Sequence, residues 1–132
     1  GQDAGAVSPD STGKWRERGH PRGFGTFPRI LGLYVRQDSV IPLEFAIRKM
    51  TSLAAQRVGL NERGLLKPGM YADITVFDQN TIIDRSTFDQ PSQLATGVSY
   101  VLVNGVPVVD GGQVTAAMQG RALRGPGYSL SH

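Results

Sequence analysis

The sequence predicts an α+β domain, and three observations lead to this fold class. Apolar residues recur at helical spacing within residues 26–57, β-branched runs flank an Asn-Gly pair within residues 98–115, and the 132 residues are one domain's worth of chain. Glycine, at 17 residues, and proline, at eight, are both abundant, which predicts many turns. We therefore expect helices in the first half and a β-sheet in the second.

Residues 1–25 are predicted to be a loop. They contain six glycines and two prolines, and neither helical nor strand periodicity runs through them. Loops of this length are uncommon inside a compact domain and are usually functional or disordered. The end of this loop and the residues after it, HPRGFGTFPRI, combine a histidine, two arginines and two phenylalanines within 11 residues.

Three helices are predicted after the loop. In residues 26–38, Thr26 can cap a helix and Pro28 fits its first turn. The apolar face of this helix consists of Phe27, Ile30, Leu31, Tyr34 and Val35. Residues 39–50 predict a second helix, with an apolar stripe of Leu43, Ala46, Ile47 and Met50. Residues 51–60 predict a short third helix, capped by Thr51 or Ser52 and ended by Gly59 in a left-handed turn.

The second half is predicted to be β-rich. Residues 71–78 alternate as a strand does, and residues 98–115 form the clearest hairpin, because Asn104-Gly105 is a strong turn signal. Pro107 in its second arm has no amide hydrogen, so it predicts a sheet edge or a bulge. The residues between these strands are predicted to be mostly loop, and residues 119–132 a frayed tail.

Composition narrows the classes of function. The chain has no cysteine, which excludes disulfides and thiolate metal sites and fits a reducing, cytoplasmic location. No apolar run approaches the roughly 20 residues of a membrane span, so no membrane partner is expected. Six basic residues and one acidic residue lie between Lys14 and Arg36. This charge fits a solvated loop or a site for an anionic substrate; a nucleic-acid partner is not expected, since no known motif accompanies it.

The residues alone do not assemble a catalytic site. Zinc normally takes three or four His, Cys or carboxylate ligands, and this chain has two histidines, of which His132 ends the tail. His20 with Asp3 or Asp10 would make a partial site at most. A G-x-S-x-G nucleophile elbow is also absent from the sequence.

A family resemblance adds more. The segment HPRGFGTFPRILGLYVRQ, residues 20–37, resembles the H-P-R-x-x-G-T-F-x-R segment of N-acyl-D-amino-acid deacylases, or D-aminoacylases, which are zinc hydrolases of the amidohydrolase superfamily. Residues 41–78 are similar to the closing passage of that superfamily, which ends here in YADITVFD. Residues 98–115 resemble its terminal hairpin, and GRALRGPGY, residues 120–128, its tail.

The resemblance implies an architecture. Members of the family are several times longer and carry a (β/α)8 barrel with the metal at its strand ends, plus a small β-sandwich domain. Residues 1–59 would be the loop after barrel strand 8 and the terminal barrel helices, residues 60–118 the C-terminal part of the small β domain, and residues 119–132 a tail. The chain would thus be the C-terminal portion of a deacylase, with zinc in the full-length parent and none expected for this chain alone.

The resemblance also implies roles for four residues. GQDAGA resembles the family's S/T-D-G/A motif, so Asp3 would lie beside the metal and carry a proton from the attacking water to the leaving amine. Arg22 or Arg29 would bind the α-carboxylate of an N-acyl-D-amino acid, and His20 would position the loop or bind the substrate. Without the resemblance, each residue has a structural alternative. Asp3 would be a solvated loop carboxylate and His20 a structural loop residue. Arg22 would anchor the loop, and Arg29 would be a surface ion-pair residue.

Two interpretations of the whole chain remain open. The first is a deacylase portion that is inactive alone; the second is a non-catalytic binding or interaction module derived from the β domain. In either case the helix face of residues 27–35 and the hairpin would lack partners, because the first would pack on a barrel and the second would pair with N-terminal strands. We therefore expect self-association through an exposed edge.

Overall fold

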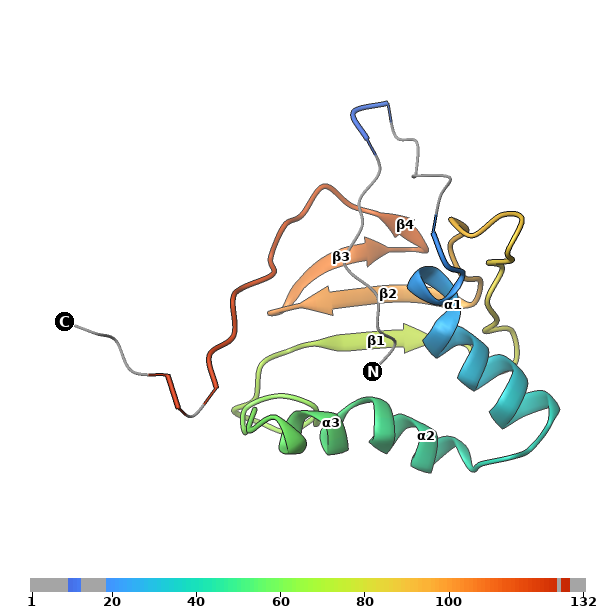
Figure 1. The fold of residues 1–132 in the computed structure, drawn as a ribbon. Helices are drawn as coiled ribbons and strands as arrows, with labels where there is room; N and C mark the ends of the chain where they lie inside the picture. Colours follow the sequence, from blue (N-terminus) through green and yellow to red (C-terminus); the bar gives the residue numbers. More distant parts are fainter. Residues whose placement is uncertain (1–9, 13–18, 126, 129–132) are drawn as a thin grey trace. The chain divides into compact units, whose positions relative to one another are not determined.

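The computed structural model describes residues 10–12, 19–125 and 127–128. The chain divides into two compact units, and each is discontinuous in sequence. The first unit comprises Gly1–Leu43 and Asp78–Gly97, and the second comprises Glu44–Phe77 and Val98–His132. Helices and an antiparallel sheet are both present (Figure 1), as the α+β prediction requires.

The helix of the first unit starts earlier than the sequence predicts. Helix α1 spans Arg22–Arg29 and continues directly into a π-helix, η1, over Ile30–Gln37. The prediction of loop up to residue 25 is therefore wrong for its last four residues. Thr26 does not cap the helix; its hydroxyl donates to the carbonyl of Arg22 at 2.8 Å, inside the helix, and Pro28 is also an interior residue.

Packing against a second segment explains why glycine-rich sequence is helical here. A Cβ at Gly25 would lie 3.0 Å from Cβ of Asp84, and one at Gly32 would lie 2.4 Å from the carbonyl oxygen of Ile82. The absence of side chains at these two helical positions lets residues 82–84 approach the helix closely. That close packing offsets the cost of about 1 kcal/mol that each helical glycine carries relative to alanine.

Residues 79–88 run along this helix in the opposite direction. At one end, Arg36 donates to the carbonyls of Gln79 at 3.0 Å and Ile82 at 2.7 Å. At the other end, Phe88 reaches His20, just before α1. The segment and the helix thus form one body, with Leu31 and Ile82 buried in its core.

The second unit contains two consecutive short helices, α2 (Leu43–Met50) and α3 (Ser52–Arg57). The predicted stripe of α2 is confirmed, because Ala46 is 1% exposed and its three other members are half-buried. The helix starts at residue 43 and not 39, since a residue before proline, here Ile41, disfavours the helical region. Gly59 has a φ of 76° after α3, which confirms the left-handed turn.

The sheet is a four-stranded antiparallel meander in the order β1-β2-β3-β4 (Figure 1). The strands are β1 (Ile74–Phe77), β2 (Val98–Val103), β3 (Val106–Asp110) and β4 (Gln113–Val114). The predicted hairpin is confirmed: β2 pairs with β3 through Asn104 and Gly105, whose φ angles of 51° and 82° are those of a type I′ turn. Because β2 has neighbours on both sides, it has no edge free for a further strand, and the edge strands of the described sheet are β1 and the two-residue β4.

Each of the two longer strand pairs contains a bulge. Val101 pairs with Val109 and Leu102 with Pro107, so Val108 is an extra residue on β3. This confirms the prediction that Pro107 lies at an edge or a bulge. A second irregularity on β2 adds Ser99 between the partners of Val76 and Phe77. Bulges of this kind increase the local twist of a sheet.

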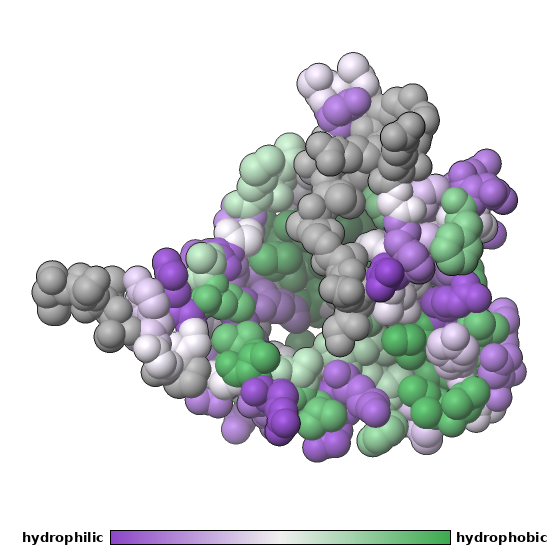
Figure 2. Space-filling model, in the orientation of Figure 1, coloured by the Kyte–Doolittle hydropathy of each residue, from purple (hydrophilic) through white to green (hydrophobic). Residues whose placement is uncertain are grey.

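Much apolar surface stays exposed in this chain. The buried apolar residues of the described chain are Leu31, Ala46, Ala55 and Ile82. On the predicted face of the first helix, Leu31 is buried, but Phe27 and Tyr34 are each 42% exposed. Apolar and polar patches alternate on the surface over α2 and α3 (Figure 2), where Phe45 and Leu53 are exposed. None of the described helices is long and apolar enough to cross a membrane.

Candidate functional site

His20 organises the start of α1. Its Nδ1 atom accepts a hydrogen bond from the backbone N–H of Arg22 at 3.1 Å. In a neutral imidazole this places the ring proton on Nε2. The ring also meets the ring of Phe88 edge to face, with centroids 5.1 Å apart and planes at 75°. His20 is exposed, so it holds the helix start while its edge still faces solvent.

Arg22 and Arg29 lie on the same side of α1. They are the first and last residues of the helix, and seven residues make almost two full turns, a rise of about 10 Å. Arg29 donates to Oδ2 of Asp84 at 3.0 Å, and this hydrogen bond raises the pKa of the guanidinium above its ordinary value. In the structure, Arg29 is thus an ion-pair residue whose partner is Asp84. Arg22 has an exposed side chain.

Asp84 and Phe88 contact this segment, and the sequence does not predict either contact. Both residues lie in a stretch that is predicted to be mostly loop. No local pattern in DRSTFDQPSQ marks them, since their partners are at least 55 residues away in sequence. They become visible only when the fold brings the two stretches together.

Asp3 lies outside the described residues, so the structure does not place it. Among the residues that are described, no group of three or more His, Cys, Asp or Glu side chains lies close enough to hold a metal ion. The described part of the chain therefore does not supply the donor set that a zinc ion needs.

The second unit contains a separate polar cluster around Asp73. Its carboxylate accepts a hydrogen bond from the backbone N–H of Asn104 at 2.9 Å and pairs with Arg63. Burial would raise the pKa of Asp73, but the Asn104 N–H and the Arg63 guanidinium together bring the pKa below its ordinary value. Asp73 is thus a carboxylate beside a turn that binds a backbone amide 31 residues away in sequence.

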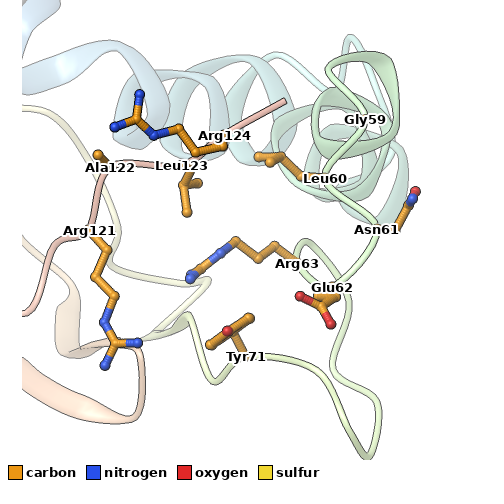
Figure 3. Close-up of a pocket in the computed structure, with 10 residues that line it drawn as sticks. All are labelled: Gly59, Leu60, Asn61, Glu62, Arg63, Tyr71, Arg121, Ala122, Leu123 and Arg124. Carbon is orange, nitrogen blue, oxygen red and sulfur yellow. The ribbon is translucent and has the colours of Figure 1, made fainter. Parts of the chain in front are cut away.

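A pocket of about 510 Å³ lies beside this cluster in the second unit (Figure 3). It contains none of the residues that the sequence predicts as a site. Arg63 extends into the hollow over the ring of Tyr71, 4.2 Å from its centroid, while Arg121 and Arg124 come from the tail. The guanidinium groups of Arg121 and Arg124 point in different directions in Figure 3, and Glu62 also lines the hollow. The arginines therefore do not converge on one anion.

Three curated deacylases are similar to this chain. It is 49% identical over 107 residues to the D-aminoacylase of Alcaligenes xylosoxydans xylosoxydans. It is 48% identical over 89 residues to the N-acyl-D-glutamate deacylase of that organism, and 45% identical over 111 residues to its N-acyl-D-aspartate deacylase. These alignments cover 81%, 67% and 84% of this chain. The chain spans about a fifth of the length of these relatives, at 22%, 18% and 22%.

Solved structures agree with the sequence comparison. A D-aminoacylase variant crystallised with copper chloride matches with a TM-score of 0.76 at 48% identity, over 79% of this chain and 22% of that one. The N-acyl-D-glutamate deacylase of Bordetella bronchiseptica, solved with zinc and a phosphonate inhibitor that mimics the tetrahedral intermediate, matches with a TM-score of 0.66 at 48% identity. That match covers 67% of this chain and 19% of that one.

The family assignment rests on the middle of the chain. The model of the amidohydrolase family matches residues 19–109, which include the His20-Pro21-Arg22 segment, the helices and most of the sheet. The resemblance to N-acyl-D-amino-acid deacylases is confirmed by the identities above. The chain belongs to the amidohydrolase family.

Proposed function

We propose that this chain is the C-terminal portion of an enzyme that hydrolyses N-acyl-D-amino acids to a carboxylic acid and a D-amino acid. The observation that carries the proposal is its identity of 45–49% to three deacylases, two of which are named for different D-amino acids. What their names share is the deacylase activity on a D-amino acid. A D-amino acid always presents an α-carboxylate, so a residue that binds this group would serve every member.

Arg22 or Arg29 would bind the α-carboxylate, and Arg22 is tested first because it belongs to the His20-Pro21-Arg22 segment at the start of α1. Arg22 is the first residue of α1, and its backbone N–H donates a hydrogen bond to His20. A planar guanidinium can donate two parallel hydrogen bonds to a carboxylate, and the positive N-terminal end of the helix dipole also attracts an anion. His20 then acts by fixing the backbone from which Arg22 projects.

The domain assignment remains a proposal that rests on the resemblance. Residues 1–59 would supply the loop after barrel strand 8 and the terminal barrel helices, residues 60–118 part of a small β-sandwich domain, and residues 119–132 a tail. Asp3 would accept the proton of the attacking water and return it to the leaving amine. Zinc would be held by residues outside the described part of this chain.

A chimera tests the proposal. The matching segment of the Alcaligenes D-aminoacylase would be replaced by this chain, and hydrolysis of N-acetyl-D-methionine would be measured for the chimera and for the chain alone. We expect turnover in the chimera and none in the isolated chain. A chimera that folds, retains its metal and shows no turnover would favour the alternative, a non-catalytic module.

A substitution in the chimera tests the role of Arg22. Removing one partner of a charge pair in a binding site costs about 2 kcal/mol or more, so Arg22→Ala should raise KM about 30-fold or more. The matched control is Arg57→Ala, because Arg57 is an exposed arginine in the last turn of α3 and should leave KM unchanged. An unchanged KM for Arg22→Ala would remove Arg22 from the site.

Self-association is also proposed for the isolated chain. In the sheet, β1 pairs only with β2, and Val76 on this strand is 45% exposed. An uncovered strand edge with apolar side chains can pair with a second copy.

A further inference from the structure

A five-residue stretch, Asp84–Phe88, contacts the first-unit helix at three points. Asp84 pairs with Arg29 at the end of α1 and packs against Gly25 in its middle. Phe88 contacts His20, two residues before the helix begins. Five extended residues span about 13 Å, close to the rise of about 10 Å along α1. The stretch is thus long enough to hold both ends of the helix at once.

The position of Phe88 is set by its own turn. The hydroxyl of Ser86, a residue that is 5% exposed, donates to the carbonyl of Gln93 at 2.9 Å. The N–H of Gln90 donates to the hydroxyl of Thr87 at 3.0 Å, and the N–H of Thr87 donates back to the carbonyl of Gln90 at 3.1 Å. These bonds close the turn on both sides of Phe88, so the ring is presented to His20 by an ordered backbone.

Phe88 is otherwise difficult to explain as a core residue. It is 79% exposed, so burial contributes little to its placement. Its ring makes an edge-to-face contact with His20, a geometry that aromatic pairs prefer and that contributes about 0.5–1.5 kcal/mol. This contact acts on the ring whose Nδ1 accepts the Arg22 N–H. A change at Phe88 is therefore transmitted through His20 to the start of α1.

We propose that Phe88 and Asp84 are positioning residues that bracket α1 and fix the orientation of the His20-Pro21-Arg22 segment toward substrate. The proposal rests on the proposed deacylase function for its consequence, but the bracket itself is a property of this chain. Phe88 acts on Arg22 through the His20 ring. Asp84 acts from the other end, by holding Arg29 and the backbone at Gly25.

The bracket is tested first in the chain itself. The chain has two histidines, so His132→Gln leaves one set of imidazole signals in a proton NMR spectrum, that of His20. Phe88→Ala should shift these signals, because the ring current of the phenylalanine is lost. Phe45→Ala is the matched control, since Phe45 is an exposed phenylalanine on α2 in the other unit and should not shift them. Unchanged His20 signals in Phe88→Ala would overturn the bracket, whatever the chain's function.

The consequence is tested in the deacylase chimera. Phe88→Ala should raise KM for N-acetyl-D-methionine about 5- to 10-fold, equivalent to about 1–1.4 kcal/mol, while kcat changes less than about twofold. Phe88→Tyr keeps the ring edge and should restore KM. With N-acetyl-D-methioninamide, which lacks the carboxylate, the effect of Phe88→Ala on KM should disappear. An active chimera whose KM is unchanged by Phe88→Ala would overturn this inference alone, whereas an inactive chimera would contradict the proposed function.

Discussion

Among the described residues, an arginine–aspartate pair is present in each unit, and the two pairs differ in which partner is less exposed. In the first unit, Arg29 is 51% exposed and Asp84 is 8% exposed. In the second, Arg63 is 13% exposed and Asp73 is 33% exposed. The less exposed partner is therefore the carboxylate in one unit and the guanidinium in the other.

In the second unit, the less exposed partner makes several contacts. Arg63 pairs with Asp73, donates to Oδ1 of Asn104 at 2.7 Å and stacks on Tyr71. The guanidinium thus ties two loop segments to the hairpin turn, and Asn104 connects that turn to the tail by donating to the carbonyl of Gln119 at 2.6 Å. In the first unit, Asp84 pairs with Arg29 and packs against Gly25. Substitution of the arginine should therefore affect the two units differently.

The largest expected effect is the loss of stability when a glycine with positive φ is replaced by alanine, because the two units pack differently around such a glycine. At Gly97 (φ 83°) a Cβ would lie 2.5 Å from backbone atoms of Ile82, whereas at Gly105 (φ 82°) it would lie 3.9 Å from its nearest neighbour, Cβ of Ala72. Gly97→Ala should lower the free energy of unfolding by about 3 kcal/mol or more, through backbone strain and overpacking. Gly105→Ala, its control, should cost about 1–2 kcal/mol through strain alone. Urea unfolding followed by circular dichroism measures both, and equal costs would contradict the close packing at Ile82.

A smaller effect should distinguish the two arginines. Arg63→Ala removes the guanidinium donor of Oδ2 of Asp73 and of Oδ1 of Asn104 and should destabilise the sheet by about 2–3 kcal/mol. Arg29→Ala removes a half-exposed, solvent-screened partner and should cost about 1 kcal/mol. Amide hydrogen exchange reports each unit separately, on the β2 amides for Arg63 and on the η1 amides for Arg29. The comparison fails if the Arg29 variant loses as much protection as the Arg63 variant.

The smallest expected effect is a dependence of the free energy of unfolding on pH. The folded-state pKa of Asp73 is below its ordinary 3.8, so the unfolded chain binds the proton more tightly. The stability that this carboxylate contributes is present above about pH 4 and is lost as the pH falls through the lower folded value. Asp73→Asn should flatten the fall in the free energy of unfolding on acidification. Asp78→Asn is the control in the other unit; its pKa is lowered by the Asn80 N–H, but the side chain is fully exposed, so the flattening should be weaker.

The sequence predicts the second unit well because its signals are local. Asn104-Gly105, Gly59 and Pro107 each act through their own backbone, and the structure confirms the turn, the left-handed helix end and the bulge. The first unit was predicted less well. Gly23 and Gly25 argue against a helix, and the packing that favours the helix at Gly25 comes from Asp84, at a sequence separation that no local pattern shows.

The candidate site divides in the same way. His20, Arg22 and Arg29 were identified from a contiguous motif, and the structure places all three at or on α1. That Arg29 already has a carboxylate partner, and that Phe88 meets His20, depends on contacts with residues 84–88. Such contacts depend on the whole fold, so they could not be predicted from spacing.

The interleaved order of the two units has a consequence for how the chain folds. Strands β2 to β4 are contiguous and can form from short-range contacts, whereas β1 pairs with β2 only by closing a loop of about 20 residues, Asp78–Gly97. That closure costs about 2–3 kcal/mol of chain entropy. Once β1 is in place, the N–H of Asp78 donates to the carbonyl of Gly97 at 2.8 Å, so the ends of this loop already meet. Assembly of the sheet thus already includes the loss of loop-closure entropy for the segment that contacts α1. We therefore expect the meander to form first and the contacts between residues 84–88 and α1 to form last.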